Sequence, residues 1–347
     1  MAILHTVSFA NFICKFGDQL NLLDLAENVV IPAFLNPRQA VRTYNETRYF
    51  FLDTELINLS LDKNHPILAI AGRFIKDTIV HREQIYEPQV GLIKTPQSME
   101  SAPSSIFLLI LNNHKLVYSA ETSNAPGTGS FRSTVHWYLT RQWQDFVSAE
   151  YGRRKLSAKK ELTPVEMQRI TKTMITKEFP RPTLDIVPIP SEMSLTEFID
   201  RYETLKTISL KILKTNSEID NSNLLRLARR TGSELNATSS TITHSGGDST
   251  LDKNEAKIQL KAVALDGNTE LRLSGKDKFG VTLTGNNEEF RARVPVEQLS
   301  ANISIAAAQL FKTFNSQVAQ SHIHLADSAD SNQISNRIAE IAKKRNV

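Results

Sequence analysis

Four short strand-like stretches follow one another between residues 257 and 294, and this spacing constrains the fold more than any other feature of the sequence. The stretches cover residues 257–265, 269–274, 279–284 and 289–294, and each link between them contains a glycine. Alternating apolar and polar residues joined by short, glycine-containing links are typical of consecutive antiparallel strands. We therefore predict a four-stranded antiparallel meander, covered by a helix over the amphipathic residues 299–314.

The N-terminal half of the sequence also carries strand and helix signals. The apolar run 106–111 is separated from a second run, 116–118, by Asn112 and Asn113. Asparagine tolerates the positive φ angles of tight turns, so this pattern indicates a β-hairpin. Apolar residues between 131 and 146 recur at a spacing near 3.6, which predicts a helix. The predicted fold class is therefore α+β, with two sheet-containing lobes.

The chain has 347 residues, the length of two typical domains. We predict an N-terminal α+β domain over residues 1–149, a basic connector and helix over 150–183, a C-terminal α+β domain with the meander over 184–325, and an amphipathic helix over 326–347. The helix of the connector is expected to begin at Thr163-Pro164-Val165-Glu166, which combines an N-cap, a first-turn proline and a capping glutamate.

Hydropathy and cysteine content exclude several classes of protein. The longest apolar run, 106–111, is far shorter than the ~20 residues that cross a bilayer. Cys14 is the only cysteine, which excludes an internal disulfide framework and a cysteine-based zinc site and fits a reducing cytoplasm. We therefore expect a cytoplasmic protein without direct membrane insertion, and we predict no cofactor and no metal site.

Positive charge is concentrated in two parts of the chain. The net charge is only +4, yet residues 101–183 hold 12 basic and 6 acidic side chains, and residues 257–347 hold 12 and 9. Because Lys and Arg side chains neutralise phosphates, such concentration is typical of a surface that binds polyanions. An ordinary solvated surface has the same composition, so that alternative stays open.

The predicted meander contains one candidate nucleic-acid-binding face. Side chains two residues apart on a strand share a face, which places Lys261, Arg272, Arg291 and Arg293 on one side of the sheet. A sheet face rich in Arg and Lys can lie along a phosphate backbone. The alternative is a solvated face whose cations form cross-strand ion pairs with neighbouring glutamates.

The densest run of positive charge lies in the predicted connector. It comprises Arg153, Arg154, Lys155, Lys159 and Lys160. In a flexible arm these side chains would reach phosphates, whereas in a plain linker they would only keep the chain soluble. Arg226, Arg229 and Arg230 invite the same interpretation, but cations in the last turns of a helix complement its macrodipole, which is the simpler explanation.

Catalytic patterns are sparse in the sequence. Neither a Walker loop nor a serine-nucleophile elbow is present. Glu255 and Lys257 have the carboxylate-x-lysine spacing of metal-dependent nucleases, with Asp248 or Asp252 as the second carboxylate. We predict that the protein is not an enzyme, and a metal-dependent nuclease is the enzymatic alternative.

The last predicted helix suggests a second class of function. Ile334, Ile338 and Ile341 lie on one face of it, at the spacing of an amphipathic helix. Such a face would serve as a dimer or partner helix. The chain would then be a protein-interaction scaffold without nucleic-acid binding.

The order of elements also resembles that of a known group of proteins. Residues 105–117 lead through a loop rich in Pro, Gly and Thr into a helix, 184–189 precede a short helix and the stretch 208–212, and a Lys-rich meander follows. Over residues 100–300 this layout resembles the RexA-type phage-exclusion proteins and, more loosely, the KwaB component of Kiwa antiphage systems. The C-terminal helix with its basic end departs from the RexA pattern, and no residue is carried over.

The resemblance implies a cytoplasmic, dimeric protein that binds DNA through basic surfaces and acts beside a membrane-protein partner. Together with the charge distribution, it leads us to expect a sequence-tolerant DNA-binding sensor or regulator of a bacterial antiphage system, most simply a homodimer. DNA is the expected nucleic acid rather than RNA.

Overall fold

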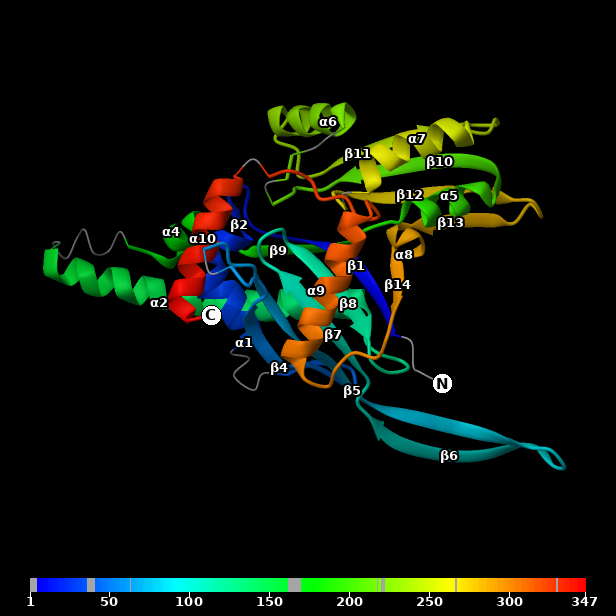
Figure 1. Ribbon diagram of the computed structural model, residues 1–347, viewed down its shortest axis with the longest axis horizontal. Helices are drawn as coiled ribbons and strands as arrows, with labels where there is room; N and C mark the ends of the chain where they lie inside the picture. Colours follow the sequence, from blue (N-terminus) through cyan, green and yellow to red (C-terminus); the bar gives the residue numbers. More distant parts are fainter. Residues whose placement is uncertain are drawn as a thin grey trace.

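The computed structural model describes residues 5–35, 41–62, 64–161, 170–216, 218–219, 222–265, 267–328 and 330–347. Two antiparallel sheets and the helices packed against them make up these residues, which confirms the α+β class (Figure 1). Within the described part of the chain, no helix combines the length and apolar character that crossing a membrane requires.

The larger sheet has ten strands in the order β14-β1-β8-β7-β5-β4-β3, with β2 and β9 also paired to β1 and β6 paired to β5. Its strands are β1 (His5–Phe16), β2 (Leu20–Asn21), β3 (Arg42–Tyr44), β4 (Thr47–Asn58), β5 (Leu68–Glu87), β6 (Gly91–Ser101), β7 (Ser104–Ile110), β8 (Lys115–Ala120), β9 (Pro182–Pro188) and β14 (Arg293–Val296). The predicted hairpin is present as β7 and β8, but the residue of its turn with positive φ is His114, at 56°, and neither asparagine.

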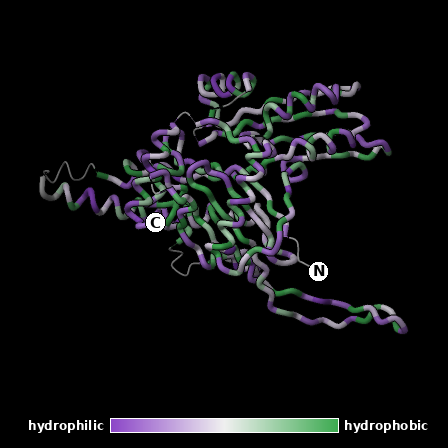
Figure 2. Tube along the Cα trace, in the orientation of Figure 1, coloured by the Kyte–Doolittle hydropathy of each residue, from purple (hydrophilic) through white to green (hydrophobic). Residues whose placement is uncertain are grey.

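Both faces of the larger sheet are covered, which explains why its central strands are apolar on both sides. One face packs against η1 (Leu22–Leu25), η2 (Ala26–Val30), α1 (Ile31–Leu35), α2 (Thr128–Glu161) and α10 (Ser331–Arg345), and α4 (Lys172–Glu178) lies against α2. Helix α9 (Ile303–Ala319) covers the other face. Green apolar segments are accordingly concentrated in the centre of the molecule (Figure 2).

The smaller sheet has four strands in the order β11-β10-β12-β13. They are β10 (Tyr202–Ile212), β11 (Ser240–Ser245), β12 (Thr269–Asp277) and β13 (Thr282–Asn286). Helices α5 (Glu192–Asp200), α6 (Asn223–Glu234), α7 (Lys253–Ala264) and α8 (Asn287–Phe290) belong to the same lobe, and their apolar side chains share a core with the sheet.

Two strands of the predicted meander are wrong. Residues 257–264 belong to helix α7 (Lys253–Ala264), because Ala256, Leu260 and Val263 are buried at helical spacing and Asp252 caps the first turn. Residues 289–294 form the end of α8 and the start of β14, which pairs with β1 in the larger sheet. The residues predicted to cover the meander form α9, which packs on the larger sheet instead.

The predicted connector is helical where the structure describes it. Helix α2 continues to Glu161, across the expected boundary at residue 149. The helix start predicted at Thr163-Pro164-Val165-Glu166 lies outside the described residues. Strands β9 and β14 fall almost entirely in the range assigned to the C-terminal domain, yet they pair with residues 10–16 and 5–8 of β1, so this range contributes two strands to the larger sheet.

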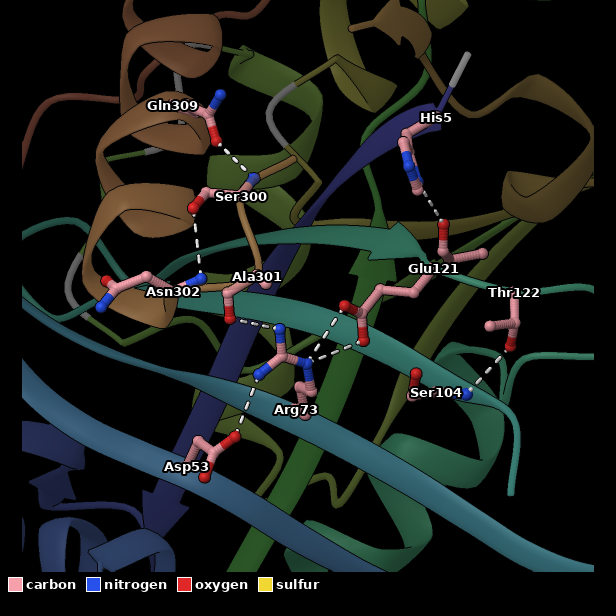
Figure 3. A network of polar contacts seen from close by, with 11 residues as sticks. His5, Asp53, Arg73, Ser104, Glu121, Thr122, Ser300, Ala301, Asn302 and Gln309 are labelled. Carbon is pink, nitrogen blue, oxygen red and sulfur yellow. Dashed lines mark hydrogen bonds and ion pairs between the residues drawn. The ribbon is translucent and has the colours of Figure 1, made fainter. Parts of the chain in front are cut away.

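Arg73 on β5 attaches the loop before α9 to the larger sheet (Figure 3). Its guanidinium donates hydrogen bonds to the Ala301 carbonyl at 2.7 Å, to Asp53 at 3.0 Å and to Glu121 at 3.1 Å. Charge-assisted hydrogen bonds of this kind are stronger than neutral ones. They hold α9 in register with the strands that it covers.

Strands β5 and β6 continue beyond the sheet as a two-stranded arm, which extends to the lower right in Figure 1. Residues 78–87 pair with 91–101 and with no other strand among the described residues. The arm carries several exposed apolar side chains: Ile79, Val80, Tyr86, Val90, Leu92 and Met99. An isolated hairpin is marginally stable in water, so an arm of this length suggests a contact element.

Candidate anion-binding site

The four cations predicted for one sheet face do not share a face. Lys261 lies on α7 and forms an ion pair with Glu192. Arg291 follows α8 and pairs with Glu288 at 3.0 Å.

The other two cations of that set lie in different sheets. Arg272 is exposed on β12 of the smaller sheet, whereas Arg293 is exposed on β14 of the larger one. The prediction of one continuous basic strip on the meander is therefore wrong. Of the four segments expected to form the meander, only the one that forms β12 places one of these cations in the smaller sheet.

The prediction that the basic residues between 153 and 160 form a flexible arm is also wrong, because these residues belong to α2. Arg153 binds Glu150 at 2.7 Å, and Arg154 binds Glu150 at 2.6 Å and Glu178 at 2.7 Å. The Lys155 ammonium lies 4.8 Å from the centroid of the Tyr151 ring.

Two further lysines complete that predicted run. Lys159 and Lys160 are part of the α2 backbone, and their side chains lie outside the described residues. Since the arginines before them are engaged with carboxylates of the same chain, an incoming phosphate would have to compete with these ion pairs.

The predicted dimer helix packs against the chain's own core. Ile338 and Ile341 of α10 are 0% and 3% exposed, and Ile334 is partly buried against the same cluster. Their apolar face covers η1 and η2 and is not free for a partner. The prediction of a docking face at Ile334, Ile338 and Ile341 is therefore wrong.

The residues of the nuclease alternative are on a helix. Glu255 and Lys257 lie in the first turns of α7, where the Lys257 ammonium binds Asp200 at 2.5 Å. Among the described residues, no group of three or more His, Cys, Asp or Glu side chains is arranged to hold a metal ion. The geometry therefore provides no support for this alternative.

A cation-lined cavity of about 560 Å³ lies where the two lobes meet. Lys15 at the end of β1 contributes from the larger sheet, and Lys214 and Arg229 contribute from the smaller lobe. We call these three residues the cation cluster. Two acidic groups are close to it: Asp18 pairs with Lys214, and the Glu218 carboxylate acts on Lys15 through space.

Backbone carbonyls position the cation cluster. The Lys15 ammonium donates to the Thr215 carbonyl at 3.2 Å, and the Arg229 guanidinium donates to the Leu213 carbonyl. Gly17, with φ of 68°, makes the turn that presents Asp18 beside the cluster, and a Cβ at this position would meet Pro180 at 2.8 Å. The cluster is thus held by residues that also join the lobes.

The electrostatics of Lys15 favour an anion in this cavity. Burial lowers the pKa of Lys15, and the like charges of Lys214 and Arg229 act in the same direction, while Asp18 and Glu218 oppose them. A bound anion would relieve both the repulsion and the loss of hydration. The lining also includes five hydroxyl-bearing residues, a side-chain type that can donate to phosphate oxygens: Thr215, Ser233, Thr238, Ser239 and Ser240.

A buried charged cluster lies next to this cavity, on the same face of β1 as Lys15. Lys115 is 2% exposed; its ammonium donates to Asn11 Oδ1 at 3.0 Å and lies 4.0 Å from the Glu218 carboxylate. Asn11 also donates to Asn268 Oδ1 at 2.9 Å, so the network connects β1 to the smaller lobe. His114 is buried beside it, and its Nε2 atom has no hydrogen-bond partner among the described residues.

The protonation of His114 makes the stability of the fold depend on pH. Burial, reinforced by the Lys115 charge and opposed by Glu218, lowers the pKa of His114 from 6.5 to about 4. Below pH 6.5 the unfolded chain binds a proton at this histidine that the folded chain does not bind, so the folded state loses stability as the pH falls toward 4.

We expect the free energy of unfolding to decrease by about 2 kcal/mol between pH 7 and pH 5 from this group alone. Urea unfolding at the two pH values measures it. The matched variant His114→Asn, which keeps a residue that tolerates positive φ, should lose most of the difference. An equal pH dependence in both proteins would contradict the assignment to His114.

Sequence reasoning missed most of the cation cluster. The sequence pattern explains Arg229 by the helix macrodipole, and it gives no reason to select Lys15 or Lys214. They are separated by almost 200 residues of sequence. The available signal was weak: Lys15 lies near the end of a strand that is buried over most of its length, a position where a charge needs a partner or a ligand.

Comparison with models of known protein families and with curated protein sequences finds no match for this chain.

Proposed function

We propose that this chain is a sequence-tolerant nucleic-acid-binding protein whose phosphate contacts come from the cation cluster. The observation that carries the proposal is the convergence of Lys15, Lys214 and Arg229 on one open cavity that serine and threonine residues also line. Phosphate contacts supply most of the sequence-independent affinity for nucleic acids. Nucleic-acid binding is also the function expected from the sequence, but the surface that carries it here is the cation cluster and not the predicted meander.

Helix α6 would extend this surface along a strand of nucleic acid. Arg226 and Arg230 are exposed within one turn of Arg229, and Glu234 is the only acidic residue of the helix. Glu234 lies 3.7 Å from Arg230, at the exposed surface, where an ion pair contributes little. Several phosphates can thus be contacted in succession by one helix and the cavity beside it.

Removal of the cation cluster is expected to weaken binding strongly. In the variant Lys15→Gln/Lys214→Gln/Arg229→Gln, affinity for a mixed-sequence 20-mer should fall at least about tenfold, and the slope of log K against log salt should become shallower by about 2–3. Fluorescence anisotropy over a salt series measures both. Lys214→Gln alone, at an exposed position, should show about one third of the change in slope without affecting folding.

The matched control removes the same charge elsewhere. Arg272→Gln/Arg293→Gln/Lys312→Gln eliminates three exposed cations that are distributed over β12, β14 and α9. We expect its salt slope to remain close to that of the unchanged protein. Equal losses in both triple variants would show that only net charge matters, and no complex at low salt would contradict the proposal.

The biological setting that we propose is antiphage sensing together with a partner protein. The part of the layout resemblance to RexA-type proteins that precedes the predicted meander supports this setting, and it favours DNA as the ligand. Competition among double-stranded DNA, single-stranded DNA and RNA of the same sequence tests the preference. Tighter binding of RNA than of either DNA would contradict the DNA assignment.

The arm formed by β5 and β6 favours a second candidate, a self-associating scaffold. Six apolar side chains are exposed along it, and Pro96 in β6 lies at the irregularity in the pairing with β5, while residues 79–87 of β5 contain no proline. The outer edge of β5 is thus open to addition of another strand. The contact element would then be the arm, and not α10.

Excision of the arm tests the scaffold. Replacement of residues 79–100 by a short Asn-Gly turn should change the free energy of unfolding by less than about 1 kcal/mol, because the arm contributes little to the cores. Light scattering should show a dimer of the full chain and a monomer after excision. A full chain that stays monomeric at high concentration would contradict the scaffold.

A further inference from the structure

A second, smaller cavity of about 200 Å³ adjoins the cation-lined one. Gln19 lines both, so the two cavities are neighbours at the turn that follows β1. The smaller cavity is bounded by η1, by the turn between β7 and β8, and by the first turns of α10. Its volume is below the range of about 300–1,000 Å³ that is typical of drug-sized ligands, which limits its occupant to a small group.

One buried polar atom at this cavity has no hydrogen-bond partner among the described residues. It is Nε2 of His114, a residue that is 4% exposed and lines the cavity. Asn21 lines the cavity as well, at the N-cap of η1. Buried polar groups are almost always satisfied, so the His114 ring points to a ligand that supplies the missing hydrogen bond.

The side chains that line the smaller cavity offer hydrogen-bond donors and acceptors side by side. Gln19, Asn21 and Gln333 contribute three carboxamides, each with a donor and an acceptor. His114 remains neutral near pH 7 because burial lowers its pKa, so its ring also offers one donor and one acceptor. Carboxamides pair with the edges of nucleobases, which present donors and acceptors side by side.

The charged residues of the cavity do not favour a simple ion. Arg337 is engaged with Asp24, which also accepts a hydrogen bond from the Asn21 backbone at 2.6 Å. No set of three metal-ligating side chains is present in the described part of the chain. A neutral, hydrogen-bonding group is therefore the best chemical match.

We infer that the smaller cavity binds the base of a nucleotide whose phosphate lies in the cation-lined cavity. The base hydrogen-bonds to His114, Asn21 and Gln333, and Gln19 lies between base and phosphate. The inference rests on the proposed function and specifies it: the site accepts a terminal or unstacked nucleotide, or a free mononucleotide. Recognition of bases that are not stacked in a helix is common among proteins that bind single strands.

Calorimetric titrations of the full chain with small ligands test the inference. The ligands are inorganic phosphate, ribose 5-phosphate and the monophosphates of adenosine, guanosine, cytidine and uridine. We expect at least one nucleotide to bind tenfold or more tightly than ribose 5-phosphate. Gln333→Ala, at an exposed position, and His114→Asn should each remove most of this gain and leave the affinity for ribose 5-phosphate unchanged.

The matched control is Asn336→Ala, which removes an exposed carboxamide from α10 outside the cavity and should change nothing. Nucleotides that bind no more tightly than ribose 5-phosphate would overturn the inference and leave the phosphate site intact. A gain that survives both Gln333→Ala and His114→Asn would overturn it as well. Failure of the proposed function has a separate signature: the Lys15→Gln/Lys214→Gln/Arg229→Gln variant would bind long nucleic acids as tightly as the unchanged protein.

Discussion

Replacement of Glu218 by leucine is expected to lower the free energy of unfolding by about 3–5 kcal/mol. The carboxylate is almost fully buried, and it accepts hydrogen bonds from the Asn216 backbone at 2.9 Å and from the Asn11 side chain at 3.3 Å. The nearby Lys115 charge holds the pKa of Glu218 below its ordinary value, although burial acts in the opposite direction. Its removal leaves the Lys115 ammonium buried without its carboxylate.

The double variant Lys115→Met/Glu218→Leu provides the control for this prediction. Because no buried charge remains uncompensated, its loss of stability should be smaller than the sum of the two single losses by at least about 1–2 kcal/mol. Urea unfolding of the four proteins completes the cycle. Strictly additive losses would show that the two side chains do not act as a pair.

Truncation of Phe131 to alanine is the second change with a large expected effect, about 3–5 kcal/mol of unfolding free energy. Phe131 lies in the first turns of α2 and is fully buried. Its ring centroid lies 5.1 Å from that of Phe107, 5.4 Å from that of Phe74 and 5.8 Å from that of Phe51. Truncation leaves a cavity among rings from three strands, which cannot close without moving the sheet.

Thermal and urea unfolding measure this loss, and the same helix provides a matched control. Leu156 of α2 is 65% exposed, so Leu156→Ala should change stability by less than about 0.5 kcal/mol. A small loss for Phe131→Ala would mean that the aromatic cluster repacks. Comparable losses at both positions would mean that burial does not determine the result, since alanine is the best helix former and propensity favours both variants.

Several elements could be predicted because their signals are local. The apolar runs of β1, β5 and β7 and the helical periodicity of α2 and α10 each lie within one segment of sequence, so no knowledge of partners is needed. The single cysteine, Cys14, lies in one of these strands and is fully buried.

Helix α7 was missed for a reason that its own residues reveal. Ile258, Leu260 and Ala262 alternate with polar residues, which favours a strand, but Ile258 is 59% exposed in the structure. The helical pattern that includes Ala256, Leu260 and Val263 and the capping Asp252 was the better signal. Over the twelve residues of α7, the strand period of two and the helical period of about 3.6 fit many of the same apolar positions. Burial of one helix face against the neighbouring sheet favours the helix.

The candidate site was less predictable than the fold, because its residues are brought together only by long-range pairing. Lys15 meets Lys214 and Arg229 through the contact of β1 with the segment after β10, where Cys14 donates its backbone N–H to Asn216 at 3.2 Å. The cations that are adjacent in sequence, such as Arg153 and Arg154, are engaged with carboxylates one helical turn away. Density of charge along the chain was therefore a poor guide to exposed charge.

The sequence by itself determined the mixed α+β class and most of the apolar strands and helices, because hydrophobic periodicity acts within a segment. Tertiary structure alone decided that β14 joins β1, that α10 is buried and that three distant cations share a cavity. The physical reason is that side chains become a site only through pairings between segments far apart in the chain, which the local pattern of neither segment encodes.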